Sequence, residues 1–269
     1  MPLPIIRGII DRRILVNYRV DPEVLSKVLP EPFRPLTIHG HGMAGICLIR
    51  LKQVRPRFLP GWVGTASENA AHRIAVQWEQ NGDLCEGVYV PRRDTSSRLN
   101  TLLGGRLFPG VHHLGRLQIN EQSGRYRVSL HGDDGLYLTV EGRQTSKWPE
   151  RSVFRTIEEA SAFFERGAVG YSPTARTSAS GNPSEFEGLE LRTSNWRVEP
   201  LAIDKVESSY FEHEPTFPKG SVEFDSALLM RGIRHEWHVR PTIECCEQPG
   251  TGLQERLQIA LPEGGRLAS

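Results

Sequence analysis

Two adjacent histidines, His112 and His113, stand at the start of an apolar run that is typical of a β-strand. Successive side chains of a strand point to opposite faces, so at most one of the two rings can enter the interior of a barrel. A histidine in that position would titrate near neutral pH and could donate or accept a proton. The pair is therefore a candidate for acid–base chemistry, and the sequence leaves open which ring faces inward.

Amine chemistry is restricted by the small number of lysines. Among the 33 lysines and arginines, five are lysines: Lys27, Lys52, Lys147, Lys205 and Lys219. A covalent imine with a carbonyl substrate requires a primary amine, so one of these five would have to reach the active site.

Other metal and nucleophile patterns are weak. The four cysteines contain no C-x-x-C pair, so we expect reduced thiols and no structural zinc. His39 and His41 could share a metal on a strand, but their Gly-rich setting favours a turn. His235 and His238 are offset by three, which places them on opposite faces of a strand, one packed and one at the surface. Motifs of Rossmann, P-loop, zincin and α/β-hydrolase proteins are absent from the sequence.

The composition is that of an ordinary globular protein, with 38% hydrophobic residues, 24% charged residues and a formal charge of +1. Near-neutral charge argues against a nucleic-acid partner, which usually requires many cations on one face. A signal peptide and an apolar run long enough to span a membrane are both lacking, so we expect a cytoplasmic protein without a membrane partner.

Apolar runs typical of β-strands dominate the sequence, so we expect strands to position the candidate site residues. The runs are Ile9–Val20, Met43–Val54, His72–Glu79, Glu86–Val90, His112–Ile119, Tyr126–His131, Leu136–Arg143, Glu190–Val198, Val206–Glu212, Val222–Met230 and Glu236–Val239. Turn residues bound most of them. The pattern predicts a mainly β fold with a few short helices, in which antiparallel strands form a barrel or paired curved sheets.

Three short helices are predicted between these strands. Asp21 and Pro22 form an N-cap and a first-turn proline, and Thr156 opens a capping box before a helix that stops at Gly167. A third helix is expected over 95–103, where we interpret Asp94 and the following Thr-Ser-Ser as a cap rather than a nucleophile.

The chain is expected to form one domain over residues 1–247. The polar segment 172–188 is rich in Ser, Gly and Pro, and we interpret it as a long surface loop rather than a domain linker. Residues 248–269 contain few apolar side chains, and we expect a flexible tail.

Several motifs in one order resemble the acetoacetate decarboxylase superfamily. They are the N-Y-R-V-D strand end at 17–21, the K-V-L-P-E-P helix exit at 27–32, T-A-S-E-N at 65–69, E-G-V-Y-V at 86–90 and G-G-R-L-F-P at 104–109. The later segments F-F-E-R-G-A-V-G-Y-S at 163–172 and W-R-V-E-P at 196–200 are similar to the uncharacterised bacterial YqjF-like branch of that superfamily. The resemblance covers about residues 5–240.

This resemblance implies an antiparallel β-barrel or cone with a central pocket, and in the decarboxylase a Schiff-base lysine. The family places that lysine in a pair just after a proline, where this chain has Pro109 followed by Gly-Val and then His112 and His113. None of the five lysines lies there, so decarboxylation through an imine is not expected, although Lys52 or Lys205 could enter the pocket from another strand.

By motif, the resemblance implies site roles for three further residues. Glu68 matches the acidic position, Arg106 belongs to the Gly-Arg element, and Arg12 lies within one residue of a carboxylate-binding arginine. In an apolar barrel such groups could bind an acid and move a proton, with His112 or His113 as a further catalytic group. Each also has a structural interpretation: Glu68 as a turn cap, and either arginine as a surface ion pair.

Three functional hypotheses remain open from the sequence. The first is cofactor-independent acid–base chemistry on a small oxo or hydroxy acid, as in a lyase or isomerase, with Glu68 as the proton carrier, an arginine binding the carboxylate, and no metal. The second is binding of an organic acid or an apolar ligand without chemistry. The third is a retained Schiff-base lyase. A homo-oligomer is compatible with each of them.

Overall fold

The computed structural model describes residues 4–97, 110–174 and 185–244. Its strands are β1 (Ile6–Val20), β2 (Arg34–Pro35), β3 (Thr37–Ile38), β4 (His41–Pro56), β5 (Thr65–Gln80), β6 (Asp83–Thr95), β7 (His112–Gln122), β8 (Arg125–Gly132), β9 (Tyr137–Gln144), β10 (Val169–Pro173), β11 (Glu185–Thr193), β12 (Glu199–Ser208) and β13 (Val222–Glu244). The helices are α1 (Pro22–Val28), the short 3-10 helix η1 (Gly61–Val63) and α3 (Ile157–Arg166). The mainly β class predicted from the sequence is confirmed.

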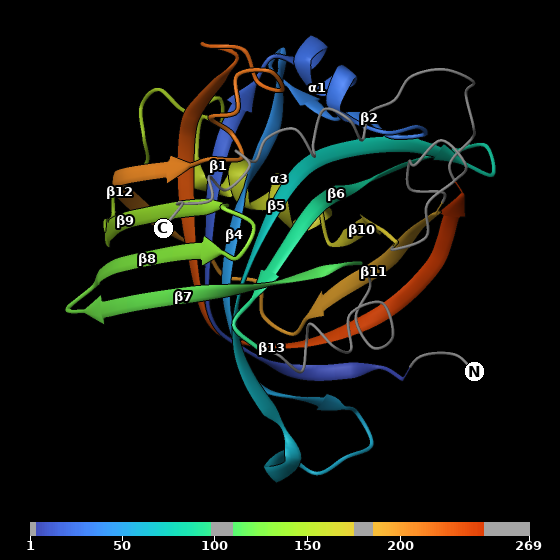
Figure 1. Cartoon of the computed structure of the whole chain (residues 1–269), viewed down its shortest axis with the longest axis vertical. Helices are drawn as coiled ribbons and strands as arrows, with labels where there is room; N and C mark the ends of the chain where they lie inside the picture. Colours follow the sequence, from blue (N-terminus) through green and yellow to red (C-terminus); the bar gives the residue numbers. More distant parts are fainter. Residues whose placement is uncertain (1–3, 98–109, 175–184, 245–269) are drawn as a thin grey trace, which may run out of the picture.

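Hydrogen bonding joins the strands into one 13-stranded sheet that closes along two circuits. The first circuit runs through β6, β5, β4, β1, β13, β11 and β10. The second shares β13, β1, β4, β5 and β6, and it returns through β7, β8, β9 and β12. In Figure 1, β7, β8, β9 and β12 lie to the left of β1, β4 and β5, and β10 and β11 lie to the right of them. The shared strands can therefore present one face to each circuit.

Two strand pairs differ from the antiparallel arrangement expected. Strand β6 pairs in parallel with β7 and with β10. Side chains alternate between the two faces of a strand whichever way its neighbour runs, so alternation by itself does not show the pairing direction. These two parallel pairs place β6 where the circuits meet.

Several predicted boundaries were wrong. The runs predicted as Val222–Met230 and Glu236–Val239 form the single strand β13, and the run Glu190–Val198 ends at Thr193. The ends of the predicted loop 172–188 belong to β10 and β11, because Phe186 is fully buried there. Residues 175–184 and the predicted tail 248–269 lie outside the described residues.

The helix caps follow the sequence. The Asp21 carboxylate accepts a hydrogen bond from the Glu23 amide at the start of α1. Thr156 Oγ1 accepts from the Glu159 amide at the start of α3, while the Glu159 carboxylate accepts from the Arg155 amide. The third predicted helix is wrong at its start, because Thr95 ends β6, and residues 98–109 lie outside the described range.

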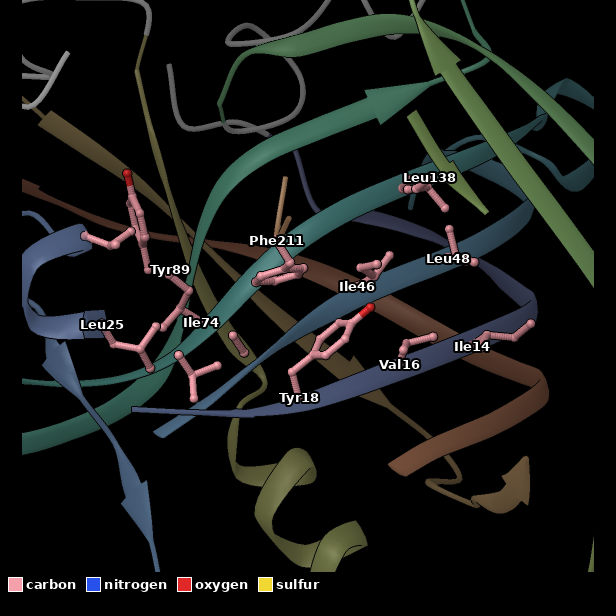
Figure 2. Packing of buried hydrophobic residues seen from close by; sticks show 14 of the residues in the cluster. Ile14, Val16, Tyr18, Leu25, Ile46, Leu48, Ile74, Tyr89, Leu138 and Phe211 are labelled. Atoms are coloured by element: carbon pink, nitrogen blue, oxygen red, sulfur yellow. The ribbon is translucent and has the colours of Figure 1, made fainter. Parts of the chain in front are cut away.

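Alternation along the shared strands creates two apolar clusters. In the first, Ile14 and Val16 of β1 pack with Ile46 and Leu48 of β4, and Figure 2 shows them beside Leu138 of β9. In the second, Leu15 of β1 and Cys47 of β4 pack with residues of α3, namely Ala160, Phe163 and Phe164. At these positions of β1 and β4, even-numbered residues therefore belong to the first core and odd-numbered residues to the second.

Buried neutral histidines make the fold sensitive to acid. His72 is fully buried, and burial together with the charge of Arg92 lowers its pKa to about 3. His235 is 3% exposed, and burial together with Arg13 lowers its pKa to about 4. In the unfolded chain these histidines bind protons near pH 6.5. Their contribution to the free energy of unfolding is therefore fully present above that pH and is lost as the pH falls toward 4.

We expect each of these histidines to cost about 2 kcal/mol of unfolding free energy at pH 5 relative to pH 7. His235→Phe should flatten the dependence of stability on pH between 6.5 and 4, as measured by urea unfolding. His131→Phe, at an exposed position, is the matched control and should leave the dependence unchanged. An unaltered slope in the His235 variant would contradict this account.

Candidate functional site

A cavity of about 150 Å³ lies within the first circuit. Its lining comes from strands β1, β4, β5, β6, β7, β10, β11 and β13, and much of it is apolar. The polar groups that line it include Arg13, Asn69, Arg73, Arg93, Asp94 and His112. Three arginines thus converge on one small and largely apolar space.

The three arginines have hydrogen bonds but no ion pairs with carboxylates of the described residues. Arg13 donates from Nε to the Cys47 sulfur at 3.3 Å, and Arg93 donates from Nε to the Ser172 hydroxyl at 3.0 Å. Arg73 donates to the side-chain oxygen of Asn17 and lies over the Phe164 ring, 4.7 Å from its centroid. Within the described chain, the three guanidinium groups of the cavity are therefore not paired with carboxylates.

Burial alters the acidity of two of these groups. It lowers the pKa of Arg73 and of Arg93 to about 10, because the charged form loses solvation. Both guanidinium groups still carry a proton at neutral pH. The cavity is therefore strongly electropositive and suited to an anion.

His112 is the histidine of the pair that lines this cavity. Its Nδ1 lies 3.2 Å from the Gly110 carbonyl oxygen, which can only accept, so Nδ1 carries the proton and Nε2 is the basic nitrogen. Burial, followed by the charge of Arg93, lowers its pKa to about 4. Gly110 has a φ of 83°, and a Cβ there would lie 2.6 Å from Cβ of Ser172, so the turn that places His112 requires glycine.

Glu68 and Arg12 are brought together, but outside the lining of this cavity. Arg12 Nη2 lies 2.6 Å from Glu68 Oε2, and Arg12 also bonds Glu121. Arg50 bonds both Glu68 and Glu121. Arg12 is 2% exposed and Glu68 is 15% exposed. These four residues form a partly buried ion-pair network, in which Arg12 is the buried member.

Strand register explains the separation of this network from the cavity. Arg12 pairs with Arg50, and Arg50 pairs with Glu68, so the three form one row across β1, β4 and β5. In the adjacent row, Arg13 pairs with Ile49, and Ile49 pairs with Asn69. All three residues of this adjacent row line the cavity. A shift of one residue moves a side chain to the opposite face.

His113 lines a second cavity of about 230 Å³. Arg92 lines it too, and bonds Asp94 at 2.8 Å and Asp134 at 2.5 Å. His113 Nδ1 lies 4.0 Å from Asp134, and burial followed by the charge of Arg92 lowers the pKa of His113. Because Arg93 pairs with His112 in register, each cavity receives one arginine and one histidine from β6 and β7.

All five lysines fall within the described residues, and all are exposed. Lys52 pairs with Asp11 at 2.9 Å, and Lys205 pairs with Glu207 at 3.0 Å. Neither lines the first cavity. Arg106, a predicted substrate-binding residue, lies outside the described residues.

Sequence reasoning missed Arg13, Arg73 and Arg93. Two of them belong to arginine doublets on strands, at 12–13 and 92–93. Such a doublet must place one guanidinium on each face of the strand, and this signal could have identified them.

No cluster of three or more His, Cys, Asp or Glu side chains suited to a metal occurs among the described residues. His39 and His41 flank a turn, as predicted, and His39 pairs with Glu159. In the described parts of the chain, no helix is long and apolar enough to cross a membrane.

Solved structures of acetoacetate decarboxylase-like proteins match the fold of this chain. Acetoacetate decarboxylase from Legionella pneumophila has a TM-score of 0.57 at 11% identity, over 90% of this chain and 89% of that one. An acetoacetate decarboxylase-like enzyme from Sphingomonas wittichii has a TM-score of 0.53 at 13% identity, over 91% and 95%. The enduracididine biosynthesis enzyme MppR, complexed with pyruvate, has a TM-score of 0.52 at 12% identity, over 91% of both chains.

Within this class, the family is given by the sequence. The family model DUF2071, described as an uncharacterized conserved protein, matches residues 10–214. The chain belongs to that family. A comparison with curated proteins found no match. The predicted acetoacetate decarboxylase-like fold is confirmed by the solved structures.

Proposed function

We propose that the first cavity binds a small organic acid and that His112 moves a proton on the bound ligand, without a Schiff-base lysine. The observation that carries the proposal is the convergence of Arg13, Arg73 and Arg93 in one cavity without carboxylate partners among the described residues. Guanidinium groups in a dry site bind carboxylates strongly and with defined geometry. The related fold of MppR, solved with pyruvate, supports a small oxo acid as ligand class.

His112 suits proton abstraction next to a carbonyl group. Its basic Nε2 belongs to a ring that is neutral at pH 7, because its pKa is lowered to about 4. An anion bound to the arginines would offset the charge of Arg93 and raise that pKa toward the working pH. Glu68 was the first candidate for this role from the sequence, but its pairing with Arg12 and Arg50 favours a structural role.

The test is exchange of the protons next to the oxo group of pyruvate and 2-oxoglutarate in D₂O, followed by NMR. We expect the protein to accelerate exchange over buffer, and His112→Gln to reduce the acceleration at least about 100-fold while the acid still binds. His113→Gln is the matched control, because its ring lines the second cavity. Equal exchange in wild type and His112→Gln would refute the catalytic part.

Binding without chemistry is the second candidate. It is favoured by the polar lining, in which His112 is the one histidine and the Asp94 carboxylate is already held by Arg92. It predicts that an organic acid raises the melting temperature and is recovered unchanged, without deuterium, after long incubation.

A further inference from the structure

We infer that the first cavity is matched to a doubly charged acid, such as a short dicarboxylate, in preference to a monocarboxylate. The inference rests on the proposed function and narrows its ligand class by charge. The charges of the residues around the cavity support it, because a dianion would balance them.

The positive side of the count is three guanidinium groups. Nη1 of Arg13 and Nε of Arg73 are buried and have no hydrogen-bond partner among the described residues. Arg73 is 6% exposed, so water does little to solvate its charge. Buried charges are costly unless a counter-charge and hydrogen bonds compensate them. These atoms are donors that a bound ligand could satisfy.

The negative side of the count is a single surplus carboxylate. Asp94 lines the cavity, but both its oxygens accept from Arg92, which also binds Asp134. Asp94, Asp134 and Arg92 together carry a net charge of minus one. They therefore offset one of the three positive charges of the cavity. His112 is neutral at pH 7 and adds no charge to the cavity. Two positive charges are left, which equals the charge of a dicarboxylate.

The arginines are also distributed for two anionic groups. Arg93 comes from β6 and is held by Ser172 of β10, whereas Arg73 comes from β5 and stacks on Phe164 of α3. Arg13 comes from β1, lines the same cavity as Arg73 and donates to Cys47 of β4. One carboxylate could bind Arg93 while the other binds Arg13 and Arg73.

The size of the cavity restricts the ligand further. A cavity of about 150 Å³ is the size that holds benzene in another protein. Malonate and succinate are near this size, whereas larger acids would require the walls to move.

The experiment compares each dicarboxylate with its monoamide by titration calorimetry on the full chain, at matched ionic strength. Succinate and succinamate differ by one charge at almost constant shape, as do malonate and malonamate. We expect at least one of the two dianions to bind at least tenfold more tightly than its monoamide. Equal or tighter binding of both monoamides would overturn the inference but leave the proposed acid site intact. Absence of saturable binding in both series would overturn both.

Variants then test whether the named arginines supply the preference. Arg73→Gln and Arg93→Gln should each reduce the ratio of monoamide to dianion dissociation constants at least about threefold. Arg127→Gln removes an exposed guanidinium that pairs with Glu141, and it should leave the ratio unchanged. A ratio that stays at the wild-type value in both cavity variants would overturn the inference.

Discussion

Arg92→Met lowers the free energy of unfolding by about 3 kcal/mol, whereas Arg93→Met leaves it unchanged or raises it by about 1 kcal/mol. Asp94 has a fully buried side chain and both its oxygens accept from Arg92, so loss of Arg92 leaves a buried carboxylate without its cation. Arg93 has no carboxylate partner among the described residues, and its loss removes an uncompensated charge at the expense of one hydrogen bond to Ser172. Urea unfolding at pH 7 without added ligand measures both effects.

The same two variants separate stability from binding. Arg93→Met should weaken succinate or malonate binding about 100-fold, because truncation of one partner in a buried charge pair costs several kcal/mol. Unchanged or higher stability combined with weaker binding is the result expected for a residue that serves ligand binding at a cost in stability. Equal destabilisation by both replacements would show that Arg93 is held by the fold as firmly as Arg92, and would remove the argument for an anion site.

Glu68→Gln lowers the free energy of unfolding by about 3 kcal/mol and leaves affinity for a dicarboxylate within tenfold of wild type. Arg12 is 2% exposed and binds Glu68 at 2.6 Å, so the variant leaves its charge poorly compensated by Glu121. The cavity lining lacks Glu68, so binding there should persist.

Glu141→Gln is the control for Glu68→Gln, since Glu141 forms an exposed pair with Arg127 at 3.4 Å. Exposed pairs contribute little, and we expect a change below about 0.5 kcal/mol. A Glu68 variant that unfolds like wild type but no longer accelerates proton exchange would restore Glu68 as the proton carrier and contradict the structural role.

The elements were largely predictable because their signals are local. Asp21 and Thr156 cap helices where the sequence placed caps, and the strands begin or end within a few residues of most of the apolar runs. Side-chain hydrogen bonds at caps and apolar alternation depend on neighbours in sequence. The order of the motifs also predicted an acetoacetate decarboxylase-like fold, which the solved structures confirm.

The site was only partly predictable because it depends on which face of each strand a residue occupies. The sequence drew attention to positions 12, 68 and 112, and the structure gives the cavity Arg13, Asn69 and His112. Register irregularities lie between Ile10 and Arg12 on β1 and between His72 and Ile74 on β5. Each such shift moves the following side chains of the strand to the opposite face of the sheet, and no local sequence pattern reveals it.

The sequence by itself determined a mainly β protein with an acetoacetate decarboxylase-like fold, and it showed that residues 109–113 contain no lysine. The tertiary structure alone decided that all five lysines are exposed, that Glu68 pairs with Arg12, and that Arg13, Arg73 and Arg93 meet around one cavity. The physical reason is that charge balance is a property of groups far apart in sequence. Whether a guanidinium is compensated depends on strand pairing across the whole sheet.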